Sequence, residues 1–184
     1  MQMSTTIDDT RVTDVLRAGG IAVLRTDTLY GVVARADDER AVERVYRLKH
    51  RLPNKSCVIL LDTPSAAYGH STELSQDIAQ YAGEPTSFLI PAEQAPHWLL
   101  RANDELAYRV PQTASLRALI RRTGPLIAPS ANPEGLPPAL SISEAVQYFG
   151  DAVDVYVDGG SVPSDTRPSR LVRIHPDGSI ERLR

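Results

Sequence analysis

Five short polar segments of the sequence could carry chemistry. They are residues 25–28, 49–55, 108–111, 128–133 and 168–170. Their hydroxyl, amide and cationic groups suit the binding of polar and anionic ligands. The sequence has no G-x-S-x-G elbow, no G-x-G-x-x-G loop and no Walker A loop, and its four histidines lack the spacing of metal ligands. We therefore expect a site that binds and positions ligands, with no protein-built metal site.

The second of these segments is the most basic part of the chain. The run from Arg47 to Lys55 also holds Lys49, His50 and Arg51, and it contains no acid. Cations spaced along a loop can each meet a separate oxygen of a triphosphate. Two plainer interpretations stay open: a solvated surface, and cations that favour the C-terminal dipole of the preceding helix.

The first and third segments each suggest a contact at the end of a strand. Thr26, Asp27 and Thr28 follow a short apolar strand. They could hold a polar ligand, or simply stabilise a turn through local side-chain hydrogen bonds. Arg109 lies near the end of another apolar strand, so its guanidinium must reach water, a carboxylate or a phosphate. We expect either a bidentate carboxylate contact or an arginine exposed on an edge strand.

The fourth segment holds two small polar side chains in a rigid stretch. Pro133 disfavours helical backbone at Asn132, so Ser130 and Asn132 would project from the same side. This pair is either a ligand clamp or part of a turn that caps the sheet. Ser169, in the fifth segment, is either a hydrogen-bond donor to a ligand or a surface residue.

Hydrophobic periodicity and turn residues predict the elements that must position these segments. Helices are predicted at residues 8–18, 38–48, 74–82, 115–122 and 143–149. Strands are predicted at 21–24, 57–61, 87–90, 106–110, 126–128, 153–157, 171–174 and 179–183, the last two as a hairpin. This mixture, with some connections too short for helices, predicts an α/β or α+β sheet with parallel and antiparallel pairs. The polar segments lie at strand ends, where open α/β sheets bind ligands.

Length and composition predict one cytoplasmic domain that spans residues 1–184. The net charge of −3 does not by itself indicate a nucleic-acid partner. Cys57 is the only cysteine, so we expect no internal disulfide, a reducing compartment and a buried thiol. The N-terminal residues lack an apolar signal-peptide core, and no apolar stretch approaches the roughly 20 residues of a membrane span.

The order of these segments along the chain resembles the YrdC-like family of threonylcarbamoyl-AMP synthases, in its short single-domain form. The resemblance runs from about residue 11 to residue 174. Its motifs are Thr26-Asp27-Thr28-Leu29-Tyr30-Gly31, Lys49-His50-Arg51, Gly83 with Thr86, Arg109-Val110-Pro111, Pro129-Ser130-Ala131-Asn132 with Gly135, Gly159-Gly160 and Pro168-Ser169. The first motif and the Ser-Ala-Asn triplet are the most specific.

The chain also departs from the family pattern. Ser56-Cys57 stands where Pro-Leu is usual. The charged departures are Arg25 and Glu84 in place of prolines, Glu134 in place of a serine, and Arg170 in place of a threonine. Charged changes near a pocket could alter its ligand. They leave open a diverged paralogue that acts on another acyl-adenylate substrate.

The resemblance implies an open, twisted α/β sheet with a concave basic face, and a nucleotidyltransferase activity. Threonine, bicarbonate or CO2, and ATP would give threonylcarbamoyl-AMP and pyrophosphate, the first step of tRNA threonylcarbamoyladenosine modification. It implies Lys49 and Arg51 as catalytic residues that hold the ATP phosphates, with Ser130 and Asn132 on the nucleotide. The threonine-binding residues that it implies are Thr26, Tyr30, Arg109, Ala128 and Ser169.

The resemblance also implies partners. Mg²⁺ would enter with ATP, no organic cofactor would be tightly bound, and tRNA threonylcarbamoyltransferase proteins would use the product. We expect a monomer without a membrane partner. Three alternatives stay open: a non-catalytic protein that binds double-stranded RNA or ribosomes through the basic face, a domain that forms a carbamoyl adenylate, and an interaction module with an empty pocket, which the departures from the family pattern favour. An aromatic content of 5% disfavours the first, and the short chain with one cysteine disfavours the second.

Overall fold

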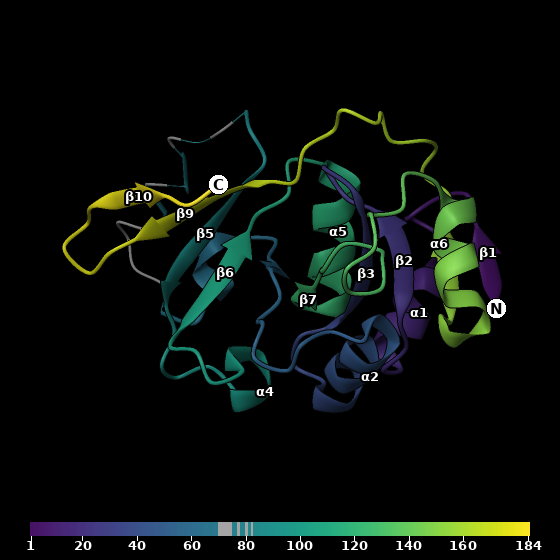
Figure 1. Ribbon diagram of the computed structural model, residues 1–184, viewed down its shortest axis with the longest axis horizontal. Coiled ribbons are helices and arrows are strands. Elements are labelled where there is room, and N and C mark those ends of the chain that lie inside the picture. Colours follow the sequence, from purple (N-terminus) through teal and green to yellow (C-terminus); the bar gives the residue numbers. More distant parts are fainter. Residues whose placement is uncertain (70–74, 77, 80, 82) are drawn as a thin grey trace.

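The computed structural model describes residues 1–69, 75–76, 78–79, 81 and 83–184 (Figure 1). Its α-helices are α1 (Thr10–Arg17), α2 (Glu39–Lys49), α4 (His97–Leu100), α5 (Ala114–Thr123) and α6 (Ile142–Phe149), with 3-10 turns at Pro64–Ala66 and Gly150–Ala152. Its strands are β1 (Gln2–Ser4), β2 (Ala22–Arg25), β3 (Tyr30–Arg35), β4 (Ile59–Leu60), β5 (Thr86–Pro91), β6 (Glu105–Arg109), β7 (Leu126–Ile127), β8 (Val155–Val157), β9 (Arg170–Ile174) and β10 (Ile180–Arg182). Of the helix predicted at 74–82, residues 75–76 and 78–79 are helical and residue 81 is in a turn, and the other residues lie outside the described ones.

The ten described strands form one open mixed sheet in the order β1-β8-β2-β3-β7-β4-β6-β5-β9-β10. The pairs β1/β8, β2/β8, β4/β6 and β5/β9 are parallel, and the other pairs are antiparallel. The predicted mixture is therefore confirmed, as is the C-terminal hairpin, in which Ile180 pairs with Ile174. In Figure 1 this hairpin lies at one end of the molecule, and α6 with β1 lies at the other.

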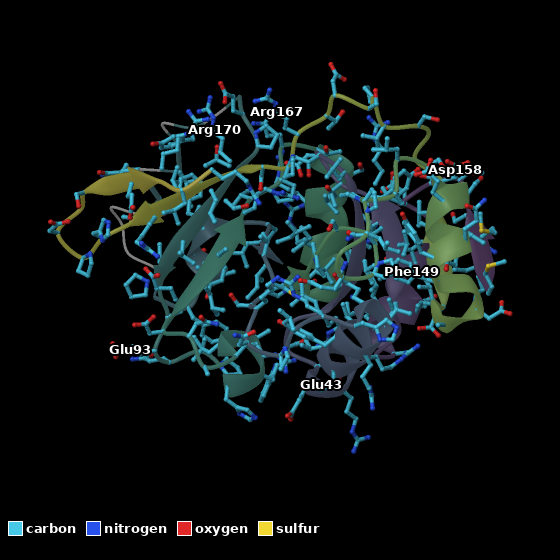
Figure 2. All side chains as sticks on the ribbon, viewed as in Figure 1. Glu43, Glu93, Phe149, Asp158, Arg167 and Arg170 are labelled. Carbon is cyan, nitrogen blue, oxygen red and sulfur yellow. The ribbon has the colours of Figure 1, made fainter. Side chains whose placement is uncertain are left out.

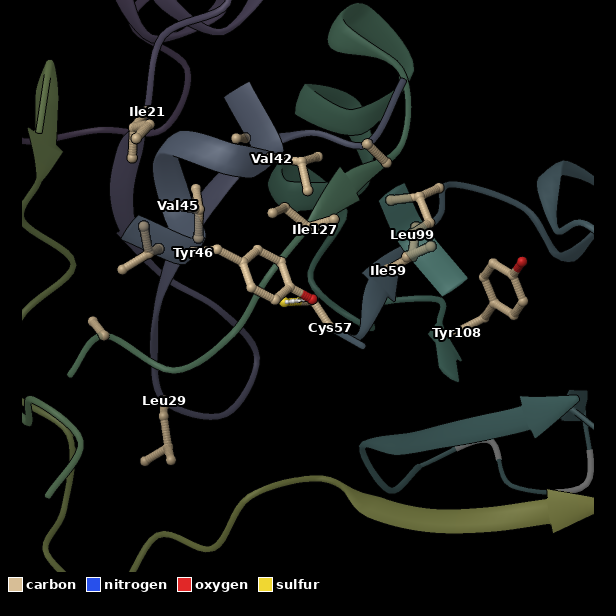
Figure 3. Packing of buried hydrophobic residues seen from close by; sticks show 14 of the residues in the cluster. Ile21, Leu29, Val42, Val45, Tyr46, Cys57, Ile59, Leu99, Tyr108 and Ile127 are labelled. Carbon is tan, nitrogen blue, oxygen red and sulfur yellow. Dashed lines mark hydrogen bonds between the residues drawn. The ribbon is translucent and has the colours of Figure 1, made fainter. Parts of the chain in front are cut away.

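Helices cover both faces of the sheet, because its central strands carry apolar side chains on both sides. On one face α1 and α5 pack against Ala22 and Leu24 of β2. On the other face, α2 and α6 belong to a second hydrophobic cluster, which contains Val23 of β2. Figure 3 shows Tyr46 of α2 beside Cys57, whose thiol donates to the Tyr46 hydroxyl over 3.4 Å. The predicted burial of Cys57 is confirmed, and burial raises the pKa of this thiol.

The two ends of α2 determine where the basic segment begins. Asp38 caps the helix by accepting a hydrogen bond from the backbone nitrogen of Ala41 over 3.0 Å. The helix ends at His50, whose φ of 49° is a left-handed conformation that reverses the chain direction. Lys49 therefore points inward from the last turn of the helix, and Arg51 begins the loop that follows.

Among the described strands and α-helices, three were not predicted: β1, β3 and α4. β3 follows the polar turn at 26–29, and its residues Val32, Val33 and Ala34 are all buried, so the strand lacks the alternation of a half-buried strand. β1 has three residues and α4 has four, too few for a periodic pattern. The strands predicted at 57–61 and 153–157 are shorter than expected, at Ile59–Leu60 and Val155–Val157.

Candidate functional site

A hollow of about 590 Å³ opens where loops from both halves of the sheet meet. Its walls come from the β2–β3 turn, the loop after α2, the end of β6, the segment after β7 and the start of β9. The predicted site residues that line it are Thr26, Tyr30, Arg51, Arg109, Ala128, Ser130 and Ser169. The fold thus gathers five segments that lie far apart in the sequence, and Lys49 and Asn132 lie outside this lining.

The turn between β2 and β3 presents hydroxyl groups at the hollow. Thr26 Oγ1 donates to the Leu29 carbonyl over 2.7 Å and accepts from the Thr28 backbone nitrogen over 3.2 Å. The two threonine hydroxyl oxygens lie 3.1 Å apart and both side chains are buried. The structure therefore shows the local-turn role of these residues, and ligand contact by Thr26 stays a prediction.

Arg109, the last residue of β6, is buried rather than exposed on an edge strand. β6 lies between β4 and β5, and the Arg109 side chain is 6% exposed. Its Nη2 lies 3.1 Å from Asp27 Oδ1 and donates to Thr26 Oγ1 over 3.4 Å. Within the described part of the chain, Arg109 Nε and both Asp27 carboxylate oxygens have no hydrogen-bond partner. Burial lowers the pKa of Arg109, and Asp27 opposes that shift. The edge-strand alternative is wrong, and the guanidinium retains an unpaired donor.

The segment after β7 runs beside β3. Gly31 and Ser130 form an antiparallel bridge, and a Cβ atom at Gly31 would lie 3.2 Å from Thr26 Cγ2. Ser130 Oγ donates to Asn132 Oδ1 over 2.5 Å, and Asn132 Nδ2 donates to two carbonyls of its own loop. The two polar side chains therefore meet, although only Ser130 lines the hollow.

Lys49 lies behind the hollow. It is 1% exposed, and its Nζ donates to the Ser130 carbonyl and, over 2.5 Å, to the Asn132 carbonyl. Burial, and next the nearby Arg51, lower the pKa of Lys49 to about 8. Lys49 thus joins the end of α2 to the Ser130–Asn132 loop, and a direct contact with phosphate stays a prediction.

Arg51 and Lys55 are the cations of the basic segment that line the hollow. Arg51 donates to the Lys55 carbonyl from Nε over 3.1 Å and to the Ser56 carbonyl from Nη2 over 2.8 Å. The Glu134 carboxylate lies 2.5 Å from Lys55 Nζ and 3.6 Å from Arg51 Nη1. Arg51 and Lys55 therefore pack against the loop after Asn132. Side chains on a purely solvated surface would not have these contacts.

Ser169, just before β9, is buried rather than a surface residue. Its hydroxyl shares a hydrogen bond with the Ser87 hydroxyl over 2.9 Å. Arg184 also lines the hollow, and its Nε and Nη2 donate to the Ser169 carbonyl over 3.1 and 3.0 Å. Sequence reasoning missed Ser87 and Arg184, because only the β5/β9 pairing and the return of the β9–β10 hairpin bring them to the site.

Tyr30 supports the wall of the hollow. Its buried hydroxyl donates to the Gly160 carbonyl over 2.8 Å and accepts from the Gly159 backbone nitrogen over 2.9 Å. Burial raises the pKa of this phenol. Arg25 donates to the carbonyls of Gly159 and Ser161 over 3.1 and 3.2 Å. Arg25 therefore stabilises the glycine pair instead of entering the hollow.

The two other charged departures at the sheet edge pair with each other. Arg170 Nη2 forms an ion pair with Glu84, and the Arg170 backbone nitrogen donates to the Pro85 carbonyl over 2.9 Å. Figure 2 shows Arg170 at the periphery of the molecule. Neither side chain lines the hollow, so this pair acts on the loop before β5 and the start of β9.

The charged residues that line the hollow are mostly cationic. They are Arg51, Lys55, Arg109, Arg173 and Arg184, with the acids Asp104 and Glu105. In the described ranges no group of three or more His, Cys, Asp and Glu residues could hold a metal ion. No helix of that same part of the chain is long and apolar enough to cross a membrane. The hollow thus suits an anionic organic ligand, and the basic character of the whole concave face stays a prediction.

An open mixed sheet with a cation-lined hollow between its loops defines an α/β protein whose hollow suits an anionic ligand. The Sua5/YciO/YrdC family model, described as "Telomere recombination", matches residues 14–184. The chain belongs to this family, and the resemblance drawn from its motifs is confirmed.

Curated relatives and solved structures agree with this assignment. The threonylcarbamoyl-AMP synthase of Stutzerimonas stutzeri is 31% identical over 89% of this chain and 95% of that protein. The synthase of Pseudomonas aeruginosa is 32% identical over 91% of this chain and 92% of that protein. These relatives are enzymes that make an adenylate, and the chain is an enzyme of this nucleotidyltransferase type.

Two solved structures share the fold. P. abyssi Sua5, complexed with L-threonine, has a TM-score of 0.84 and 24% identity, over 95% of this chain and 52% of that one. E. coli YciO has a TM-score of 0.80 and 17% identity, over 100% of this chain and 92% of that one. The chain therefore spans about half the length of Sua5 and nearly the full length of YciO.

Proposed function

We propose that this protein is an L-threonylcarbamoyladenylate synthase. It forms threonylcarbamoyl-AMP and pyrophosphate from L-threonine, bicarbonate or CO2, and ATP, and tRNA threonylcarbamoyltransferase proteins use the product to make threonylcarbamoyladenosine. The observation that carries the proposal is one hollow that joins the buried Arg109, with its unpaired donor, to the cations Arg51 and Lys55. The synthase names of the curated relatives and the L-threonine bound to P. abyssi Sua5 support it.

The first half-reaction needs threonine held by its carboxylate. Arg109 binds that carboxylate through its planar fork, with Asp27 opposite holding the guanidinium in place. Thr26 and Ser169 meet the other polar groups of the amino acid, and Ala128 and Tyr30 wall the pocket. The threonine nitrogen forms a bond to the carbon of CO2 and loses a proton to water, which gives N-carboxythreonine.

The second half-reaction transfers the adenylyl group. A carbamate oxygen attacks the α-phosphorus of ATP, and the bond from that phosphorus to the bridging oxygen of pyrophosphate breaks. Arg51 and Lys55 neutralise the charge that grows on the leaving pyrophosphate, and Ser130 contacts the nucleotide from the wall of the hollow. Asn132 lies outside that wall and holds the Ser130 hydroxyl, which donates to its Oδ1. Positioning and charge stabilisation carry most of such catalysis.

The remaining parts of the second step follow from the same contacts. Lys49 acts from behind by fixing the carbonyls of the Ser130–Asn132 loop. Mg²⁺ enters as part of the MgATP substrate, since the described residues offer no group of three ligands for it.

The test is pyrophosphate release from ATP by the purified protein, with Mg²⁺ and bicarbonate, in the presence and absence of L-threonine. We expect release that requires both threonine and bicarbonate, with threonylcarbamoyl-AMP identified by mass spectrometry. L-serine replaces threonine in one control, and carbamoyl phosphate replaces threonine and bicarbonate in another. Release with carbamoyl phosphate alone would identify a carbamoyl-adenylate enzyme, and bound ATP without release would sink the proposal.

A further inference from the structure

Glu134 places a carboxylate on the two cations that the proposed function assigns to the triphosphate. Its Oε1 lies 2.5 Å from Lys55 Nζ, and its Oε2 lies 3.6 Å from Arg51 Nη1. The Glu134 backbone nitrogen donates to the Lys49 carbonyl over 2.7 Å, which fixes the residue between α2 and the loop after Asn132. The Glu134 side chain is 26% exposed, so it can leave its partners for water without crossing the core.

The charge state of Glu134 makes this contact an ion pair. The hydrogen bond from Lys55 is the main cause that lowers the pKa of Glu134, and Arg51 and Lys49 add to it. The group is therefore an anion at neutral pH. A serine at this position, as in the family pattern, would leave Arg51 and Lys55 without this counter-charge.

The geometry also limits how a phosphate can bind. The Glu134 carboxylate already has one oxygen on Lys55 Nζ and the other near Arg51 Nη1. A phosphate that contacts both cations must displace the carboxylate, because two anions held side by side repel each other strongly in a partly buried site. Binding of a polyphosphate then exchanges one set of ion pairs for another.

We propose that Glu134 serves as an internal anion for the two cations of the phosphate site. It occupies Arg51 and Lys55 in the free enzyme, is displaced by the phosphates of ATP, and returns as pyrophosphate leaves. This inference rests on the proposed function, which gives Arg51 and Lys55 their ligand. As a consequence, the site releases pyrophosphate readily but binds ATP less tightly than it would without Glu134.

The experiment compares pyrophosphate binding by calorimetry in the wild-type protein, Glu134→Gln and Glu134→Ser. The glutamine keeps the size of the side chain, and the serine supplies the residue of the family pattern. The matched control is Glu93→Gln, which removes one carboxylate from an exposed loop position at the periphery of the molecule (Figure 2), and this residue does not line the hollow. We expect both Glu134 variants to bind pyrophosphate about tenfold more tightly, about 1.4 kcal/mol, and the control to match wild type.

Steady-state kinetics supply the second measurement. Inhibition of synthesis by pyrophosphate should strengthen, and the KM for ATP should fall, in the same proportion as the binding constant. Unchanged or weaker pyrophosphate binding in both folded variants overturns the inference, as does absence of binding in every protein. Weaker ATP binding by Glu134→Gln only when Mg²⁺ is present would also overturn it, in favour of a metal-ligand role.

Failure of the proposed function would look different. Pyrophosphate binding is measured without threonine, so it reports on Glu134 whether or not the protein makes an adenylate. A wild-type protein that binds pyrophosphate but shows no threonine-dependent release would reject the synthase assignment, and the displacement of Glu134 by pyrophosphate would still be testable by the binding constants alone.

Discussion

Replacement of Lys49 by methionine tests the buried contact behind the hollow. Methionine keeps the length and flexibility of the lysine stem but has no charge and no donor. The pKa of Lys49 falls from its ordinary value of 10.5 to about 8, mainly because the ammonium is buried. At about 1.4 kcal/mol for each unit of pKa, burying the charged form costs on the order of 3 kcal/mol.

The sign of the pH dependence follows from this depressed pKa. Between pH 8 and 10.5 the unfolded chain keeps its proton on Lys49 while the folded chain loses it. The free energy of unfolding therefore rises with pH across that window, because the unfolded state binds more protons. Below about pH 8 the full cost of burying the charge is present, and above 10.5 it is gone. Lys49→Met lacks the group. From below pH 8 to above pH 10.5, the wild type should therefore gain on the order of 3 kcal/mol of unfolding free energy relative to the variant.

Urea unfolding of both proteins, at pH values on each side of the window, measures that difference. Other titrating groups cancel in the subtraction, and Glu93→Gln serves as the control that should show a constant difference. At neutral pH the variant loses two hydrogen bonds to the Ser130 and Asn132 carbonyls, at about 1–3 kcal/mol for each buried acceptor, and escapes the cost of the buried charge. The two effects nearly offset each other. A stability difference that stays flat with pH would refute the account of Lys49 as a buried ammonium.

Three further substitutions test the other contacts. Arg109→Lys keeps a charge opposite Asp27 but loses the planar fork, so the KM for threonine should rise by about tenfold or more while the KM for ATP stays constant. Asp27→Asn leaves Arg109 buried without its counter-charge, and urea unfolding should show a loss of about 3–5 kcal/mol; a loss under 1 kcal/mol would contradict the ion pair. Gly159→Ala places a Cβ 2.7 Å from Arg25 Cβ, and should lower stability by about 1–3 kcal/mol, with Arg25→Gly restoring part of it.

Much of the fold could be predicted because its signals are local. Asp38 caps α2 and an apolar stripe continues the helix, so the predicted and observed helices differ by about one residue. The hairpin turn around Gly178 likewise acts within a few residues. β3 was missed because a strand buried on both faces shows no alternation, and the polar turn before it hid its start.

The candidate site was predictable to a lesser extent. The motif order indicated the family, and most of the residues that it named line one hollow. Arg109 was expected to meet water, a carboxylate or a phosphate, and the structure places it beside the carboxylate of Asp27. The roles of these residues toward threonine and ATP remain predictions that the experiments above address.

The sequence by itself determined the family, the mixed sheet, the longer helices and the segments that face the hollow. Only the tertiary structure decided which charges meet. Lys49 turns to the Ser130 carbonyl, and Glu134 reaches Arg51 and Lys55. The physical reason is the distance along the sequence over which each kind of interaction acts. Periodicity, capping and turn preferences act over a few residues, whereas an ion pair between two loops far apart in the sequence depends on strand order and register, which long-range packing of the sheet fixes.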